Sequence, residues 1–101
     1  MNTPNSKLLF LFNKIDISGT SMYYWLCIPE FEQAMLKLVN EGKSIDNRVV
    51  YENMAEIYNN LLPYKGTERA ADYNFYQMRR GINKLSKALQ QTNSTQAGNE
   101  P

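Results

Sequence analysis

The chain has 101 residues, which suits one domain with a modest hydrophobic core, and pairing with a second copy would add stability. Its net charge of +1 argues against binding of nucleic acid through bulk charge. There is no histidine, the usual general base and commonest metal ligand. One cysteine, Cys27, excludes an internal disulfide and suits a reducing compartment, so we expect a cytoplasmic protein.

No segment has the pattern of a secretion signal or a membrane span. The longest apolar runs, Leu8–Phe12 and Met22–Ile28, are far shorter than the roughly 20 residues that cross a bilayer. Residues 1–6 and 92–101 are polar and offer little to bury, so we expect both ends to be disordered. The remainder, residues 7–91, is expected to form a single helical domain.

Residues 7–17 contain a continuous apolar block whose periodicity assigns neither helix nor strand. We favour a short helix, because a lone strand would have no partner. The next helix can begin at Thr20 or Ser21. Pro29 leaves two alternatives open: it is the first-turn proline of a helix that starts near residue 28, or it kinks one long helix from about 21 to 41.

The stretch 31–62 contains two apolar-faced segments joined by a polar turn. The first segment has apolar residues at helical spacing along one stripe: Phe31, Ala34, Met35, Leu38 and Val39. Gly42 follows this stripe at a position where a left-handed C-cap costs glycine no steric clash. The helix should therefore end near Asn40 or Glu41.

The second segment begins with a good N-cap. Asp46 can accept a hydrogen bond from the amide of Arg48 or Val49, and Ser44 is a competing cap. Apolar residues then repeat at steps of four, three and four: Val50, Met54, Ile57 and Leu61. Pro63 should close this helix, because proline has no amide hydrogen to donate.

The last helix is expected after a turn at residues 63–67, with Thr67 as its cap. Its apolar residues have the spacing of a coiled-coil seam, which can serve a dimer: Ala71, Phe75, Met78, Ile82, Leu85 and Leu89. Gly81 costs about 1 kcal/mol relative to alanine inside a helix, so we interpret it as the mark of a close approach between helices. These patterns predict an all-α domain of three or four helices.

Two groups of side chains are candidate binding sites. Tyr23, Tyr24 and Trp25 are adjacent in a helix and cannot all face one core, so at least one ring should be exposed to a protein partner. The alternative is packing beneath residues 7–12. The second group interleaves aromatic and basic residues on the face of the last helix away from the seam: Tyr73, Tyr76, Arg79, Arg80, Lys84 and Lys87.

The basic group can contact phosphates or an acidic protein surface. The alternative is a solvated face whose cations serve solubility and the helix dipole. If DNA is the partner, residues 49–62 and 68–89 form the candidate helix-turn-helix, although the last helix is long and apolar for a recognition helix.

Catalytic chemistry is sparse. Glu52 and Glu56 share a helix face, and we interpret them as solvated rather than as an acid/base pair. Cys27 is expected to pack as a small apolar residue rather than to act as a nucleophile. No glycine-rich phosphate loop or metal cluster is present in the sequence. We expect no enzyme activity, no cofactor and no small-molecule substrate.

The order of features at residues 31–50 resembles the AriR-type small enterobacterial regulators, two-component connector proteins linked to biofilm formation and acid resistance. The shared outline is the helix at 34–39, Gly42, a polar turn, Ile45 and a second helix entered at residues 46–48; the pair Leu11 and Phe12 also has a counterpart upstream. The chain departs from that outline in its extra residues between Phe12 and Phe31 and in its longer final helix and tail.

The resemblance implies an all-helical homodimer that binds a regulator, such as a response regulator, or influences DNA-bound complexes, without catalysis. We therefore expect a non-enzymatic bacterial regulator that acts by protein–protein interaction. The main alternative is a DNA-binding transcriptional regulator that uses the basic last helix. A phage- or plasmid-encoded inhibitor of a host system is a further alternative, because an asparagine- and tyrosine-rich composition fits AT-rich mobile DNA.

Overall fold

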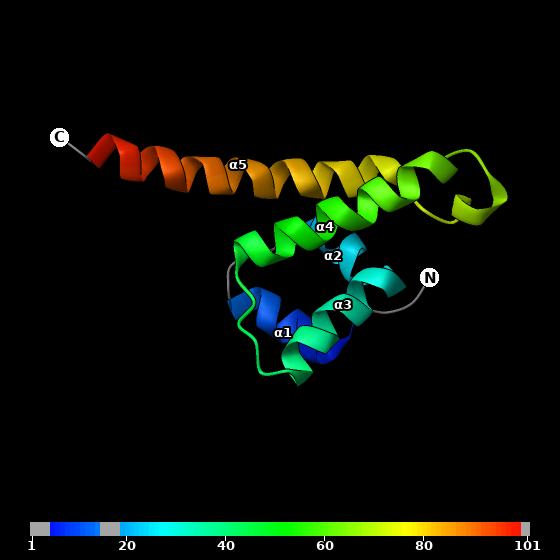
Figure 1. The fold of residues 1–101 in the computed structure, drawn as a ribbon, viewed down its shortest axis with the longest axis horizontal. Coiled ribbons are helices and arrows are strands. Elements are labelled where there is room, and N and C mark those ends of the chain that lie inside the picture. The colour runs from blue at the N-terminus through cyan, green and yellow to red at the C-terminus, as the bar shows by residue number, and fades with distance from the viewer. Residues whose placement is uncertain (1–4, 15–18, 100–101) are drawn as a thin grey trace.

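The computed structural model describes residues 5–14 and 19–99 and shows an all-helical fold, as the sequence predicts, with no strand in those ranges. The elements in chain order are α1 (Ser6–Lys14), α2 (Thr20–Leu26), α3 (Pro29–Asn40), α4 (Asn47–Leu61), the 3-10 turns η1 (Leu62–Tyr64) and η2 (Glu68–Ala70), and α5 (Phe75–Asn99). Helix α5 lies along α4 and α2, while α1 and α3 pack together at the side of α4 away from α5 (Figure 1). Within the described ranges, no helix is both long enough and apolar enough to cross a membrane.

Helix α1 settles the ambiguity of the first apolar block in favour of a helix for residues 7–14; residues 15–17 lie outside the described ranges. The helix begins at Ser6, inside the segment predicted to be disordered, because Asn5 caps it. The Oδ1 atom of Asn5 accepts a hydrogen bond from the amide of Lys7 at 2.9 Å. Residues 1–4 lie outside the described ranges.

Pro29 starts a new helix and does not kink a long one. Ile28 before it is extended, with φ −83° and ψ 120°, and Pro29 is in the first turn of α3. The residue before a proline avoids helical geometry because the proline ring would clash with it. Of the two alternatives, the separate helix is confirmed, and α2 is a short helix that can take its own direction.

Gly42 ends α3 as predicted, with φ +74°. The amide of Gly42 donates to the carbonyl of Val39 at 3.0 Å, and the amide of Lys43 donates to the carbonyl of Leu38 at 2.9 Å. These two bonds form a Schellman motif, which satisfies helix carbonyls that would otherwise lack a partner. The chain leaves this motif toward α4.

Helix α4 begins and ends where the sequence predicts. Asp46 is its N-cap, and the carboxylate accepts a hydrogen bond from the amide of Val49 at 2.9 Å. Ser44, the competing cap, lies outside the helix. The helix ends at Leu61, and Pro63 lies in the 3-10 turn that follows.

The predicted start of the last helix is wrong. Helix α5 begins at Phe75, and Thr67 instead precedes the short turn η2 without a side-chain capping bond. Asn74 caps α5, since its Oδ1 accepts from the amide of Gln77 at 3.1 Å. Asparagine is among the strongest N-caps, so the last helix begins after Asn74 and not after Thr67.

Two further features of the last helix differ from expectation. Ala71, the first residue of the predicted seam, is exposed, and its neighbour Ala70 is buried instead, because η2 precedes the helix and changes the phase of the pattern. The described helix runs to Asn99, whereas the sequence predicts disorder from residue 92. Residues 92–99 contain no proline, so each of them can continue the helical hydrogen bonding.

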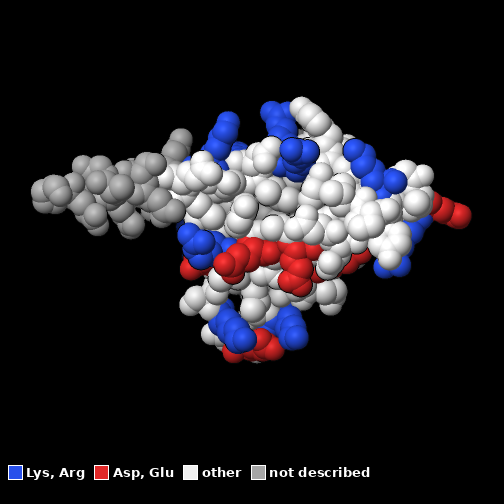
Figure 2. Space-filling view, turned by 45° about the horizontal axis from the view of Figure 1, so that its top comes forward, with Lys and Arg blue, Asp and Glu red and all other residues white. Residues whose placement is uncertain are grey.

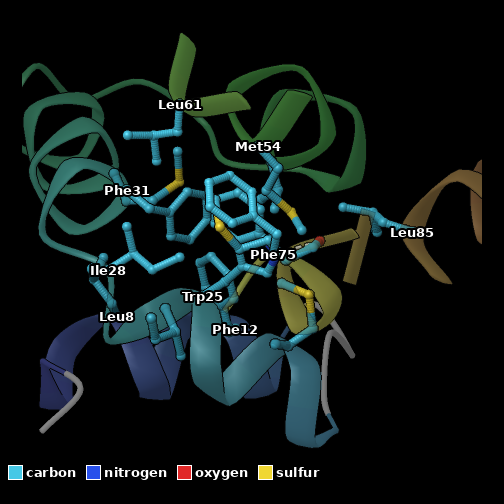
Figure 3. Close-up of a cluster of buried hydrophobic side chains, with 14 of the residues drawn as sticks. Leu8, Phe12, Trp25, Ile28, Phe31, Met54, Leu61, Phe75 and Leu85 are labelled. Carbon is cyan, nitrogen blue, oxygen red and sulfur yellow. Dashed lines mark hydrogen bonds between the residues drawn. The ribbon is translucent and has the colours of Figure 1, made fainter. Parts of the chain in front are cut away.

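The core is one cluster to which all five described α-helices contribute (Figure 3). Its largest completely buried side chains are Trp25, Phe12, Phe31, Leu8, Leu26, Met35, Met54, Met78 and Val50. The ring of Phe31 lies edge-on to Phe12, with centroids 5.9 Å apart, and to Trp25, with centroids 5.4 Å apart. Edge-to-face pairs of this kind add to the free energy gained from apolar burial.

The apolar seam of α5 faces this core and is covered by α4 and α2 of the same chain. Phe75, Met78 and Leu85 are buried in it. Up to Leu85, the seam that the sequence suggests for a dimer is therefore used within the monomer.

Candidate functional site

Trp25 is a core residue and not an exposed anchor for a partner, which corrects one of the sequence-based candidates. It has 0% of its surface exposed. Its Nε1–H donates to the backbone carbonyl of Met78 at 2.9 Å, across the contact between α2 and α5. A buried indole N–H needs such a partner, so the side chain fixes how these two helices pack.

The other two aromatic residues of this group have different surroundings. Tyr23 is 51% exposed, so it is the ring that the sequence expects to find at the surface. Tyr24 is half-buried, and its hydroxyl accepts a hydrogen bond from the backbone amide of Asn74 at 2.6 Å. Tyr24 therefore holds the start of α5 against α2, and the three adjacent rings do not form one surface.

The segment that connects α4 to α5 lines an open groove, which we call the connection groove. This segment lies at the end of α5 far from Asn99 (Figure 1). The walls of the groove include Tyr24, Tyr73 and Tyr76 and the connecting chain at residues 65–68 and 70–72. Tyr76 thus lines this groove, although the sequence analysis grouped it with the basic residues of the last helix.

Hydrogen bonds from outside the segment hold the connection groove in shape. The hydroxyl of Tyr73 donates to the carboxylate of Glu30 on α3, at 2.7 Å from Oε1. Burial, followed by this hydrogen bond, raises the pKa of Tyr73 to about 12. On the opposite wall, the amide of Asn74 is bonded to Tyr24. The groove is therefore anchored to both α2 and α3, although most of it is irregular chain.

Exposed apolar side chains gather at the same end of the molecule. Leu62 and Tyr64 in η1 are exposed, and Tyr76 at the start of α5 is 68% exposed. The guanidinium of Arg69 lies over the ring of Tyr64, 4.3 Å from its centroid, which is a cation–π distance. Ordered aromatic and arginine side chains at a surface are typical of positions that dominate protein–protein binding.

The basic residues of α5 are all exposed: Arg79, Arg80, Lys84 and Lys87. Residues 75–90 of this helix contain no acidic side chain. Figure 2 shows Lys and Arg side chains along the upper surface of the molecule, apart from a band of Asp and Glu side chains lower down. The four residues thus lie at the surface, as the binding hypothesis requires.

Some of these cations line a shallow hollow between α2 and α5, which we call the basic hollow. Its lining residues are Ser21, Gln77, Arg80, Asn83, Lys84 and Lys87. Arg79 is not among them, and Tyr76 belongs to the connection groove. The predicted nucleic-acid group is therefore split: Arg80, Lys84 and Lys87 line the basic hollow, Tyr76 lines the connection groove, and Arg79 lines neither.

Helices α4 and α5 do not form a helix-turn-helix. They are joined by residues 62–74, which include two 3-10 turns, whereas that motif has a turn of three or four residues. Helix α5 also packs along α4 through its apolar side. Any contact of α5 with nucleic acid would therefore use the exposed basic side alone.

The carboxylates and the thiol that the sequence analysis considered for catalysis have ordinary surroundings. No three His, Cys, Asp or Glu side chains come together as a metal site within the described ranges. Glu52 and Glu56 are exposed, which fits their interpretation as a solvated face. Cys27 is buried, and burial raises the pKa of its thiol, so the reactive thiolate is disfavoured.

Comparisons of the chain with protein-family models, with curated proteins and with solved structures gave no match. The fold and its surfaces define a small all-α protein with two candidate binding sites. The resemblance to AriR-type regulators stays a prediction.

Sequence reasoning missed the connection groove and three residues of the basic hollow. The groove had one signal in the sequence: Asn74 followed three positions later by Gln77 has the spacing of a capping box, which places a helix start after the irregular segment. No signal in the sequence indicates the basic hollow. Ser21 is 56 residues away from Gln77 along the chain and meets it only through the packing of α2 on α5.

Proposed function

We propose that this protein is a non-enzymatic regulator that binds another protein at the connection groove. The observation that carries the proposal is a groove lined by tyrosine rings and held by the Tyr24–Asn74 and Tyr73–Glu30 hydrogen bonds. A surface that is already ordered loses little conformational entropy on binding. Tyrosine adds large contact area with few rotatable bonds.

Tyr76 is the proposed anchor of the interaction. It is the most exposed of the large hydrophobic side chains that the structure describes, and it extends from the rigid first turn of α5. Its ring can insert between apolar side chains of a partner while its hydroxyl keeps a hydrogen bond at the rim. The groove beside it can accept a partner's side chain.

The identity of the partner as a bacterial regulator, and the homodimeric state, are extensions of the proposal. They rest on the resemblance of residues 31–50 to AriR-type regulators, which implies a dimer that binds a response regulator. Because the seam of α5 is covered up to Leu85, a dimer would need another face of the molecule. Light scattering tests the dimer directly, since one chain has a mass of 11.7 kDa.

The experiment begins with immobilised wild-type protein and nuclease-treated lysate of its own source. A protein captured in stoichiometric amount is identified by mass spectrometry, purified and titrated calorimetrically with three forms: wild type, Tyr76→Ala and Tyr23→Ala. Both tyrosines are exposed, so Tyr23→Ala is the matched control for loss of a surface ring.

The proposal expects Tyr76→Ala to weaken binding by a factor of about 30, equivalent to about 2 kcal/mol, because an anchor residue of an interface costs at least that much. Tyr23→Ala should change the dissociation constant less than about threefold, the effect of a contact outside the centre of an interface. Equal affinities for wild type and Tyr76→Ala, or the absence of any stoichiometric partner, would show that the groove is not the binding site.

A further inference from the structure

We propose that the basic hollow between α2 and α5 binds the phosphate backbone of a nucleic acid. This site is separate from the connection groove, and the proposal does not depend on the protein-binding function. It rests on three features of the hollow: its donors, the spacing of its cations and its position between two packed helices.

The floor of the hollow is fixed by a hydrogen bond between the two helices. The hydroxyl of Ser21, at the start of α2, donates to Oε1 of Gln77 on α5 at 3.1 Å. Ser21 itself is buried. This bond engages Oε1 of Gln77, and the NH₂ group of the same amide is a further hydrogen-bond donor in the lining. The site is therefore an ordered part of the helix packing and not a chance group of surface side chains.

The cations lie along one face of α5. Arg80, Lys84 and Lys87 are separated by four and three residues, which places them on neighbouring turns of the same side of a helix. Seven residues of α-helix span about 10 Å. The charges therefore form a short row and not a single point, and a row suits a chain of anionic groups better than one isolated ion.

Lys84 lines the hollow and also contacts the residue before α2. Its Nζ lies directly against Gly19, at a place where any Cβ atom would collide with it. Gly19 has φ +114°, a backbone conformation that other residues rarely adopt. Gly19, directly before α2, thus lies close to the row of cations.

The chemistry of the lining favours phosphate. The lining combines three cationic side chains with the amides of Gln77 and Asn83, and none of the six lining residues is acidic. Arginine and lysine together with serine, asparagine and glutamine are the side chains that contact phosphate oxygens and sugars in protein–nucleic acid complexes. The amide of Asn83 can accept from a sugar hydroxyl as well as donate to phosphate. A carboxylate-rich protein would bind the cations, but it would make less use of the Gln77 and Asn83 amides than a nucleic acid would.

The low net charge of the chain limits the expected strength. Three phosphate contacts predict a slope of about −2.7 for log K against log salt with duplex DNA. Binding should therefore be measured near 50 mM salt, where such contacts are screened less than at physiological salt.

The test is fluorescence anisotropy of labelled single-stranded and duplex oligonucleotides with wild type and two matched pairs of variants. Asn83→Asp introduces a carboxylate into the hollow with almost no change of shape, and Asn59→Asp does the same on the exposed surface of α4. Arg80→Gln/Lys87→Gln removes two charges from the hollow, and Lys37→Gln/Lys43→Gln removes two exposed charges elsewhere. Circular dichroism verifies that every variant retains the helical signal of wild type.

We expect both hollow variants to bind at least about tenfold more weakly, with the double variant lowering the salt slope by about 2, one for each lost phosphate contact. The two control variants should remain within about threefold of wild type, as expected for charges outside the contact area. The proposal is overturned if the controls lose as much as the hollow variants, if no oligonucleotide binds at 50 mM salt, or if polyglutamate competes as well as DNA, which would assign the hollow to an acidic protein. Tyr76→Ala should bind oligonucleotide as wild type does, so this result is independent of the groove.

Discussion

A Cβ atom added to Gly81 would lie 2.7 Å from Cδ1 of Trp25 and 2.8 Å from its Nε1. The indole ring of α2 thus rests directly on the backbone of α5. The same ring donates its N–H to the carbonyl of Met78, one turn earlier in the helix. Any side chain at position 81 would move the ring away from that carbonyl, so the glycine and the tryptophan form one unit that sets the distance between the two helices.

Gly81→Ala should destabilise the protein although alanine is the better helix former. The propensity gain is about 1 kcal/mol, but the added methyl collides with a ring that has 0% exposure. Overpacking of this kind costs about 1 to 3 kcal/mol. Because the overlap is severe, we expect the free energy of unfolding to fall by about 1 kcal/mol net. Urea unfolding followed by circular dichroism measures it.

The matched control for this substitution is Gln90→Ala, at an exposed position of the same helix. It changes the free energy of unfolding by less than about 0.5 kcal/mol, as surface substitutions do. A Gly81→Ala protein that is as stable as wild type or more stable would show that the ring can move without cost.

The loss in Gly81→Ala should depend on Trp25. In a Trp25→Phe background the indole Nε1 is absent, and with it one of the two closest contacts of the new methyl group. Trp25→Phe alone should destabilise by about 2 kcal/mol, through lost volume and the lost bond to Met78. A double-mutant cycle by urea unfolding should give a coupling energy of at least about 0.5 kcal/mol, with the double variant more stable than additivity predicts. Strict additivity would mean that the two residues act independently.

Gly81 also shows how far sequence reasoning extends in this chain. A glycine in an apolar seam indicates a close approach between helices, and this prediction is confirmed. Which side chain approaches is decided by tertiary packing, because Trp25 is 56 residues away in the sequence. Three adjacent aromatic residues show only that one must be exposed; the register of α2 on α5 selects Tyr23 for the surface and Trp25 for the core.

Local signals were the most reliable guides. Asp46 and Gly42 act through neighbouring amides and carbonyls, so their roles follow from a few residues of sequence. The prediction that Thr67 caps the last helix was wrong, because Asn74 is a better cap and lies directly before α5. The basic face of α5 was predictable, since exposed cations avoid a desolvation penalty. The basic hollow was not, because its serine comes from another helix.

Gly42→Ala should cost about 1 kcal/mol, and the cost should be conformational. Gly42 has φ +74°, and a Cβ atom there would meet nothing within 4 Å, so a steric clash with neighbouring groups does not contribute. Gly42→Asn is the discriminating control, because asparagine tolerates the left-handed conformation better than alanine does. Thermal unfolding should rank the proteins as wild type, Gly42→Asn and Gly42→Ala, in order of falling stability. Equal loss in both variants would contradict the conformational explanation.

Tyr73 should give the stability of the protein a specific dependence on alkaline pH. Its pKa is raised from 10.0 to about 12 in the folded protein, first by burial and then by the bond that its hydroxyl donates to Glu30. Folding therefore favours the neutral phenol. The stabilisation is complete below about pH 10, and it is lost as the pH rises from about 10 to about 12, where the folded protein also ionises.

Tyr73→Phe isolates this effect. At pH 8 the variant lacks the hydrogen bond to Glu30 and should be less stable than wild type by about 1 kcal/mol. As the pH is raised from about 10 to about 12, wild type loses its advantage and the difference between the two proteins should shrink. Glu30→Gln replaces the carboxylate by a neutral acceptor and keeps Tyr73. The stability of this variant should therefore depend less strongly on pH than that of wild type. Urea unfolding at pH 8, 10, 11 and 12 measures all three proteins, and a constant difference between wild type and Tyr73→Phe across that range would show that the phenol does not ionise with the raised pKa.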